Sequence, residues 1–206
     1  MGKLIVIVGS TGVGKTALAR ALCRETGFTS GLEGHAERPF QARFKADRRF
    51  ALANQMDYLL LRAEQETGIR SRMETGVLDG GLEMDFHGFT RLFHARGWLT
   101  DDEFDLCRRF YTWTRSLLLP PDLVLHLTAR PEVIARRLAK RDRINIASAE
   151  DISLLDAFLA EWLAMLDPAR LLALDVSEDD PDYQRLLPGL VSTLQRFLVD
   201  KEAEYV

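Results

Sequence analysis

The stretch Gly9-Ser10-Thr11-Gly12-Val13-Gly14-Lys15-Thr16 follows an apolar run at residues 4–8 and fits the pattern G-x-x-x-x-G-K-[ST] at every fixed position. This pattern is typical of a phosphate-binding loop between a strand and a helix, whose glycines let backbone N–H groups surround a polyphosphate. Lys15 is expected to reach the β and γ phosphates, and the Thr16 hydroxyl to bind magnesium. A chance glycine-rich turn is the alternative. The loop predicts a nucleoside triphosphate with Mg²⁺ but does not identify the group that receives the phosphate.

Length and charge narrow the class of protein. The chain has 206 residues, 47% of them hydrophobic, which is enough for one substantial core and short for two. We therefore expect a single domain over residues 1–206. The formal net charge of −4 argues against a general affinity for nucleic acid, which needs clustered Lys and Arg. A partner the size of a nucleotide fits better.

The cysteines and histidines show no metal-binding or disulfide pattern. Cys23 and Cys107 lack C-x-x-C spacing and have no histidine at ligand spacing, so neither structural zinc nor a disulfide framework is expected. The N-terminus leads straight into a strand without a targeting segment, and no apolar run reaches the roughly 20 residues that a membrane span needs. The sequence thus predicts a soluble, cytoplasmic protein with no membrane association.

Short apolar runs alternate with helical patterns along the chain. The expected strands are residues 4–8, 77–78, 123–127 and 171–176, with a weaker one at 27–32. Such alternation predicts a parallel five-stranded sheet with helices on both faces, in a three-layer α/β/α P-loop kinase fold. Residues 40–66 are expected to form one long helix. Caps or first turns of later helices are expected at Thr100 with Glu103, Pro131, Ser148, Asp151 and Pro188.

Beyond the phosphate loop, the chain resembles the deoxynucleoside kinase family over nearly its whole length. The resemblance is carried by Glu33, Pro39-Phe40, Gln55, Arg62, Val77-Leu78-Asp79, Asp85, the segment 121–133 and the arginine-rich segment 137–143. It implies ATP- and Mg²⁺-dependent phosphoryl transfer to the 5′-hydroxyl of a nucleoside. It also implies a lid at about residues 137–148.

Two acidic residues are candidates for the reaction itself. Glu33 follows the second expected strand, at the edge where open α/β sheets bind ligands, and is the natural acceptor for the proton of the attacking hydroxyl. Its alternative is an exposed loop carboxylate. Asp79 ends the next strand and is expected beside the phosphate loop, where it can bind magnesium together with Thr16. Its alternative is a helix cap.

The resemblance assigns the acceptor pocket to Phe44, Gln55, Arg62 and Asp85. Gln55 and Arg62 are seven positions apart, so they share one helix face, and in the family this pair holds the nucleobase. Asp85 can hold Arg62 through a charge-assisted pair. Phe44 replaces a tyrosine that contacts the sugar in the family, and with Phe89 it can sandwich a base. A solvated helix face and ordinary aromatic core are the alternatives.

Lid arginines are expected at Arg137, Arg141 and Arg143. They can close over the phosphates, stabilise the developing charge and exclude water. An ordinary basic helix terminus is the alternative, since cations there complement the helix dipole.

Several positions depart from the family pattern. Gly80 follows Asp79 where the family has an arginine, and the substitutes considered are Arg70, Arg72 and the lid arginines. Gly34 stands in place of a proline, and Asn145 and Ile146 in place of glutamates. These departures leave other functions open: a kinase for a nucleoside monophosphate or another small alcohol, or a nucleotide-binding regulatory protein with weak catalysis. The amphipathic helices expected around residues 90–118 offer a face for a possible homodimer.

Overall fold

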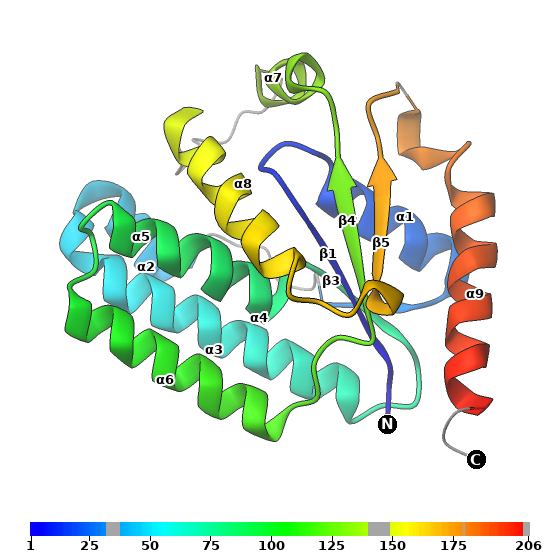
Figure 1. Cartoon of the computed structure of the whole chain (residues 1–206), viewed down its shortest axis with the longest axis horizontal. Coiled ribbons are helices and arrows are strands. Elements are labelled where there is room, and N and C mark those ends of the chain that lie inside the picture. The colour runs from blue at the N-terminus through cyan, green and yellow to red at the C-terminus, as the bar shows by residue number, and fades with distance from the viewer. Residues whose placement is uncertain (32–37, 140–148, 179, 204–206) are drawn as a thin grey trace.

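The computed structural model describes residues 1–31, 38–139, 149–178 and 180–203 (Figure 1). Its sheet has five parallel strands in the order β2-β3-β1-β4-β5, which confirms the predicted parallel five-stranded sheet. The strands are β1 (Leu4–Gly9), β2 (Thr29–Ser30), β3 (Gly76–Asp79), β4 (Leu123–Thr128) and β5 (Leu171–Asp175). β2 is shorter than the expected strand at 27–32. β1 lies at the centre, so the loop that follows it opens at the middle of the sheet's carboxyl edge.

Helices connect the strands and cover both faces of the sheet. The α-helices are α1 (Lys15–Thr26), α2 (Pro39–Ala46), α3 (Ala51–Arg70), α4 (Gly81–Glu83), α5 (Arg91–Ala95), α6 (Asp101–Leu117), α7 (Pro131–Ala139), α8 (Ala149–Leu163) and α9 (Leu187–Ala203). Short 3₁₀ turns lie at Arg48–Phe50, Pro168–Arg170 and Pro181–Tyr183. A π-helix, Met84–Thr90, joins α4 to α5.

Alternate residues of β1 divide the core into two layers. Ile5 and Ile7 pack toward α1 and α9, whereas Leu4, Val6 and Val8 pack toward α3 and α8. Since successive side chains of a strand point to opposite faces, a strand buried on both faces needs the unbroken apolar run seen in the sequence. Figure 1 shows α1 and α9 on one side of the sheet, and α3, α6 and α8 on the other. The predicted three-layer α/β/α architecture is confirmed.

The prediction of a single helix over residues 40–66 is wrong. The chain leaves α2 at Asp47, whose backbone is extended with φ −148° and ψ 115°. The Asp47 carboxylate accepts a hydrogen bond from the Arg49 N–H and starts a 3₁₀ turn, after which α3 begins at Ala51. A short acidic side chain that bonds the backbone two residues onward favours such a break over a continuous helix.

The other described helix boundaries follow the predicted signals. Thr100 and Glu103 form both hydrogen bonds of a capping box at the start of α6, and Pro131 begins α7. Asp151 is the third residue of α8, and its carboxylate accepts a hydrogen bond of 2.6 Å from Arg96 Nε. Ser148, the other predicted cap, lies outside the described residues. α9 starts at Leu187, beside Pro188, and continues to Ala203.

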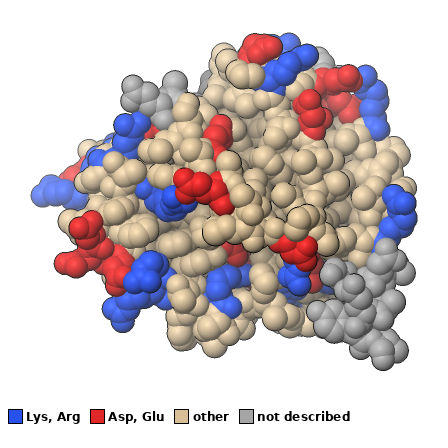
Figure 2. Space-filling view, in the orientation of Figure 1, with Lys and Arg blue, Asp and Glu red and all other residues tan. Residues whose placement is uncertain are grey.

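The outer surface mixes charges of both signs. On the face shown in Figure 2, Lys and Arg side chains are interspersed with Asp and Glu, with broad areas of other residues between them. In the described part of the chain, none of the helices combines the length and the apolar character that crossing a bilayer requires.

Candidate active site

The phosphate-binding loop connects β1 to the first turn of α1. β1 ends at Gly9 and α1 begins at Lys15, so the unpaired N–H groups of the helix start lie next to the loop. Gly14 has φ 115°, in the left-handed region that side chains rarely adopt, and a Cβ there would collide with the Tyr183 hydroxyl. The loop therefore has the backbone conformation and the nearby N–H donors that suit a bound anion.

Lys15 lies against its own loop. Its Nζ donates to the carbonyl oxygens of Gly9 at 2.8 Å and Ser10 at 3.1 Å. The ammonium group is therefore held at the loop before any ligand binds, which suits a group expected to contact phosphate oxygens.

Thr16 and Asp79, the predicted magnesium ligands, are in direct contact. The register of β1 with β3 pairs Ile7 with Asp79, and the Thr16 hydroxyl donates to Asp79 Oδ2. A hydroxyl and a carboxylate are the hard oxygen donors that Mg²⁺ prefers, so this pair fits that ion. Within the described ranges, no group of three or more His, Cys, Asp and Glu side chains is placed to hold a metal. A pair of protein ligands suits Mg²⁺, which takes its other ligands from phosphates and water.

The predicted Arg62–Asp85 pair is present and nearly buried. Arg62 Nε donates to Asp85 Oδ2 at 2.7 Å, and the two side chains are 11% and 8% exposed. Burial opposes the charge on Arg62, but the attraction and hydrogen bond of the Asp85 carboxylate, together with the charges of Asp79 and Tyr58, outweigh it and raise the pKa of Arg62. Gln55 Nε2 donates to the Asp85 backbone carbonyl at 2.8 Å, so α3 and the π-helix are joined twice at this point. The structure thus brings Gln55, Arg62 and Asp85 together.

Gln65 is a site residue that the sequence analysis missed. Its Oε1 accepts a hydrogen bond of 3.0 Å from Arg62 Nη1, and its Nε2 donates to the Gly31 carbonyl at 2.5 Å. Gln65 therefore links Arg62 to the end of β2. The one available sequence signal was its position three residues after Arg62, on the same face of a helix.

Arg137, the predicted lid arginine that falls within the described residues, contacts the phosphate loop. Its Nη1 donates to the Val13 carbonyl at 2.7 Å and its Nη2 to the Val176 carbonyl at 2.8 Å. The Tyr183 hydroxyl, also missed from sequence, donates to the Gly14 carbonyl at 3.1 Å. The last turn of α7 and the segment after β5 therefore meet on the loop.

Residues 5–193 match the protein-family model described as deoxynucleoside kinase. The chain belongs to the deoxynucleoside kinase family. A curated relative in this family, the deoxyadenosine kinase of Dictyostelium discoideum, is 27% identical over 143 residues. Those residues are 69% of this chain and 58% of the relative, so the chain spans less than two thirds of that relative's length.

Solved structures of a deoxyadenosine kinase from M. mycoides share the fold. The one with dCMP and a flexible dCDP bound has a TM-score of 0.76 and 19% identity, covering 92% of this chain and 99% of that one. The one with dATP bound has a TM-score of 0.76 and 18% identity, with coverage of 91% and 98%. The predicted P-loop kinase fold and the resemblance to deoxynucleoside kinases are both confirmed.

Three predicted residues of this deoxynucleoside kinase family site, Glu33, Arg141 and Arg143, lie outside the described residues. The departures noted at Gly34, Asn145 and Ile146 lie outside them too.

Phe44, predicted to contact the acceptor, is a core residue in the structure. Its side chain is fully buried and stacks on Phe93 with ring centroids 4.7 Å apart, while Trp98 packs edge-on. The Arg48 guanidinium lies 4.4 Å from the centroid of the Phe44 ring. The face of α2 that carries Phe44 therefore packs toward α5, and a contact between Phe44 and an acceptor stays a prediction.

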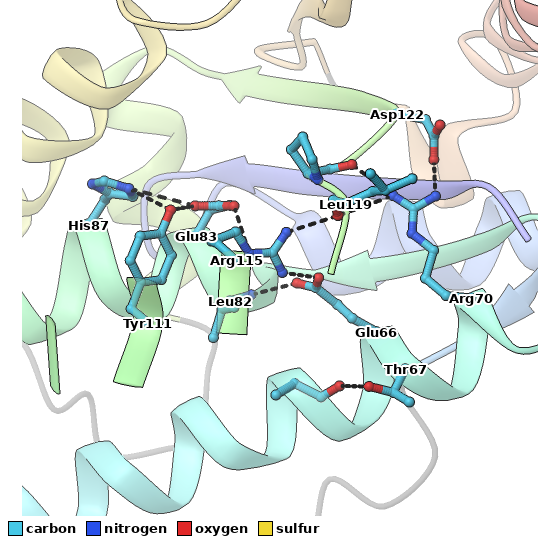
Figure 3. Close-up of polar contacts among 12 residues, drawn as sticks. Glu66, Thr67, Arg70, Leu82, Glu83, His87, Tyr111, Arg115, Leu119 and Asp122 are labelled. Carbon is cyan, nitrogen blue, oxygen red and sulfur yellow. Dashed lines mark hydrogen bonds and ion pairs between the residues drawn. The ribbon is translucent and has the colours of Figure 1, made fainter. Parts of the chain in front are cut away.

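Arg70 and Arg72 are too far along the sheet to replace the arginine that family members carry at position 80. Arg70 donates to the Gly2 carbonyl at 3.1 Å and pairs with Asp122, which itself accepts from the Leu4 N–H. These groups lie at the amino ends of β1 and β4, whereas the phosphate loop is at the carboxyl ends. Figure 3 shows the Arg70 and Asp122 side chains paired with each other.

A buried polar network packs beneath the turn that follows Asp79 (Figure 3). Arg115 Nη2 donates to Glu66, and Arg115 Nε lies 3.5 Å from Glu83 Oε1. The Tyr111 hydroxyl donates to Glu83 and lies 3.0 Å from His87 Nε2. Burial raises the pKa of Glu83 and lowers that of His87 to about 4. Sequence reasoning missed this network, since its members come from separate helices.

A cavity of about 580 Å³ opens beside the phosphate loop, between α7 and α8. Ser10 lines it, and the Ser10 hydroxyl donates to Asp156 on α8 at 2.6 Å. Its described lining is mostly apolar and includes neither the Thr16–Asp79 pair nor the Arg62–Asp85 pair. The cavity therefore lies on the side of the loop that α7 and α8 cover.

Proposed function

We propose that this chain transfers the γ-phosphoryl group of ATP to the 5′-hydroxyl of a deoxynucleoside, giving a nucleoside monophosphate and ADP. The observation that carries the proposal is the contact between Thr16 of the phosphate loop and Asp79 of β3. That contact places a pair of oxygen ligands beside a triphosphate site, one strand away from the β2 end, where the acceptor base Glu33 is expected. Membership of the deoxynucleoside kinase family supports the same reaction. A need for ATP also favours the cytoplasmic location expected from the sequence.

Each group has a task that its chemistry suits. Residues 9–16 bind the triphosphate through backbone N–H groups, and Lys15 offsets the charge of the β and γ phosphates. Thr16 and Asp79 hold Mg²⁺, which when bound neutralises charge on the phosphates. Glu33 takes the proton of the attacking 5′-hydroxyl, and Arg137, Arg141 and Arg143 stabilise the transferred charge.

The acceptor side is assigned to the residues gathered at α3 and the π-helix. Gln55 can donate and accept at a base edge once its amide exchanges the Asp85 carbonyl for a ligand. The Arg62–Asp85 pair gives a fixed, charged wall to the same pocket. The relatives point to deoxyadenosine and deoxycytidine as the first acceptors to test, because the D. discoideum enzyme is a deoxyadenosine kinase and the M. mycoides structure holds dCMP.

ADP release from ATP and Mg²⁺ with a panel of deoxynucleosides and their monophosphates tests the proposal. We expect stimulation by at least one nucleoside, no stimulation in Lys15→Ala, and a loss of about 100-fold or more in Glu33→Gln. Arg108→Ala, on the surface of α6, is the matched control and should keep full activity. Tight ATP binding without stimulation by any acceptor would favour the regulatory alternative instead.

We also infer that the chain forms a homodimer through α6. Trp113 and Leu117 are 61% and 64% exposed, and Leu60 on the neighbouring α3 is 48% exposed. Large apolar side chains gathered on adjacent helices favour burial against a second copy. Light scattering should give twice the monomer mass for the wild type and the monomer mass for Trp113→Glu. A wild-type monomer at all concentrations would contradict the inference.

A further inference from the structure

Two consecutive residues in the segment after β5 adopt a left-handed backbone. Asp182 has φ 56° and Tyr183 has φ 58°, a region that glycine adopts freely and tyrosine rarely does. The Tyr183 N–H donates to the Asp180 carbonyl at 3.0 Å. The Asp180 carboxylate accepts from the N–H groups of Arg185 and Leu186, each at 3.1 Å, so the turn is fixed on both sides of Tyr183. A backbone of this kind costs free energy and persists only where surrounding contacts impose it, which is often at functional sites.

This turn directs the Tyr183 side chain onto the phosphate loop. The ring is 6% exposed and belongs to the same core cluster as Val13 and Leu18. The hydroxyl donates to the Gly14 carbonyl at 3.1 Å, and burial raises the pKa of Tyr183, so the hydroxyl keeps this proton at neutral pH. Because a Cβ on Gly14 would collide with the hydroxyl oxygen, the contact depends on the glycine as well as on the turn.

The Gly14 carbonyl belongs to the peptide unit that also carries the Lys15 N–H. It accepts a second hydrogen bond, of 3.0 Å, from the Leu18 N–H in the first turn of α1. Two donors therefore occupy the two lone pairs of this carbonyl, which fixes the plane of the peptide unit. In a planar trans peptide the C=O and the N–H point in opposite directions. The Lys15 N–H, one of the donors that have no partner inside the helix, is thus directed away from the side where the hydroxyl binds.

The neighbouring peptide unit of the loop is held from the same side. Arg137 Nη1 donates to the Val13 carbonyl at 2.7 Å, and Nη2 donates at 2.8 Å to the Val176 carbonyl, directly after β5. Two successive carbonyls of the loop, those of Val13 and Gly14, are therefore tied to the segment after β5. The contact of Tyr183 with this backbone places it to act on a bound polyphosphate through the loop.

We propose that Tyr183 is a positioning residue for nucleotide binding, whose hydroxyl orients the Gly14–Lys15 peptide unit so that the Lys15 N–H meets the polyphosphate without reorganisation of the loop. The left-handed backbone at Asp182 sets where the hydroxyl lies. The proposal rests on the kinase function above and adds a residue that acts on the phosphates through the backbone. The hydroxyl keeps its proton throughout, and no covalent bond to Tyr183 forms or breaks.

Isothermal titration calorimetry of Tyr183→Phe with ATP and with inorganic tripolyphosphate tests this role. The variant keeps the buried ring and loses only the hydroxyl. We expect the affinity for both ligands to fall by the same factor, about three- to tenfold, because tripolyphosphate has no base or sugar. The KM for ATP should rise by a similar factor, while kcat at saturating ATP and the KM for the deoxynucleoside change by less than about twofold.

Two comparisons separate positioning from a loss of stability. Tyr111→Phe removes another hydrogen-bonded tyrosine hydroxyl, the donor to Glu83, and should lower Tm without changing either affinity. Asp182→Pro cannot adopt a positive φ, so it should weaken the binding of both ligands as Tyr183→Phe does, and the two losses should not add in the double variant. Asp182→Gly adopts that φ without strain and should bind both ligands like the wild type.

A loss of ATP affinity with the tripolyphosphate affinity unchanged would overturn the proposal, because Tyr183 would then act on the base or the sugar. A lower Tm in Tyr183→Phe with both affinities unchanged would overturn it too. Wild-type protein that binds both ligands but phosphorylates no acceptor would count against the kinase function alone, and the affinity comparison would still decide the role of Tyr183.

Discussion

Replacing Arg115 by Met removes the cation that pairs with two buried carboxylates, Glu66 and Glu83. The Glu66 side chain is 0% exposed and Glu83 4% exposed, while Arg115 itself is 13% exposed. Arg115 donates to Glu66 and to the Leu119 carbonyl at 3.1 Å, so it is held from both ends. Met fills a similar volume but offers no charge. The variant therefore leaves Glu66 with a buried negative charge and no cation to balance it.

The expected loss follows from that burial. Removing one partner of a buried ion pair destabilises a protein by about 3–5 kcal/mol, because the remaining charge stays out of water. For a chain of this size, that change lowers Tm by about 6–20 °C. Adding Glu66→Gln to Arg115→Met removes the stranded charge, so we expect the double variant to recover about 2 kcal/mol. The matched control Arg108→Met breaks a pair whose side chains are 56% and 45% exposed, and it should cost less than about 1 kcal/mol.

Urea unfolding at pH 7, followed by circular dichroism, measures all three variants against the wild type. The slopes of the transitions should agree if each variant unfolds in one step. Equal losses for Arg115→Met and Arg108→Met would refute the reasoning, because burial would then make no difference to the pair. No recovery in the double variant would show that the loss comes from packing and not from the stranded charge.

The remaining predictions concern the loop, the metal and pH. Asp79→Asn should raise the Mg²⁺ concentration for half-maximal ADP release by about tenfold or more, as titration with MgCl₂ will show. Gly14→Ala strains the backbone by about 1–3 kcal/mol, so ATP affinity by calorimetry should fall about tenfold or more, and Tyr183→Phe should restore little of it. Burial lowers the pKa of His87 from 6.5 to about 4, so stability should be full above pH 6.5 and fall by roughly 3 kcal/mol on acidification to pH 4. Urea unfolding of His87→Gln should show a shallower fall over the same range; an unchanged slope would assign the pH dependence to other groups.

Local patterns in the sequence were sufficient to predict most of the fold. An apolar run with no polar interruption requires burial on both faces, and the β1 residues meet that requirement with α1 and α9 on one side and α3 and α8 on the other. Capping at Thr100 depends on a neighbour three residues away, so it was visible too. The break at Asp47 was missed because the apolar positions on its two sides, such as Phe44 and Met56, each fit a helix. In that case a single side-chain bond to the Arg49 N–H decided the outcome.

Contacts between candidate site residues were predictable where the partners share a known spacing, and they were missed where the partners meet only through the fold. The Arg62–Asp85 pair was foreseen from the family spacing. The contact of Gln65 with Gly31 joins residues 34 positions apart, and neither segment carries a sequence pattern that predicts it. The burial of Phe44 was not predictable for a related reason: an aromatic residue on a helix has the same local pattern whether it faces a ligand or the core.

Two residues of α3 lie beside the turn that follows Asp79. Arg62 and Glu66 are four residues apart and therefore lie on the same face of α3. Arg62 Nη2 faces Gly80, while Glu66 Oε1 accepts a hydrogen bond of 3.4 Å from the Leu82 N–H. Glu66 thus holds the turn after Asp79 by a hydrogen bond, and Arg62, one helical turn earlier on the same face, lies against Gly80. Glycine at the turn leaves its own backbone permissive, so the turn depends on these outside contacts for its position.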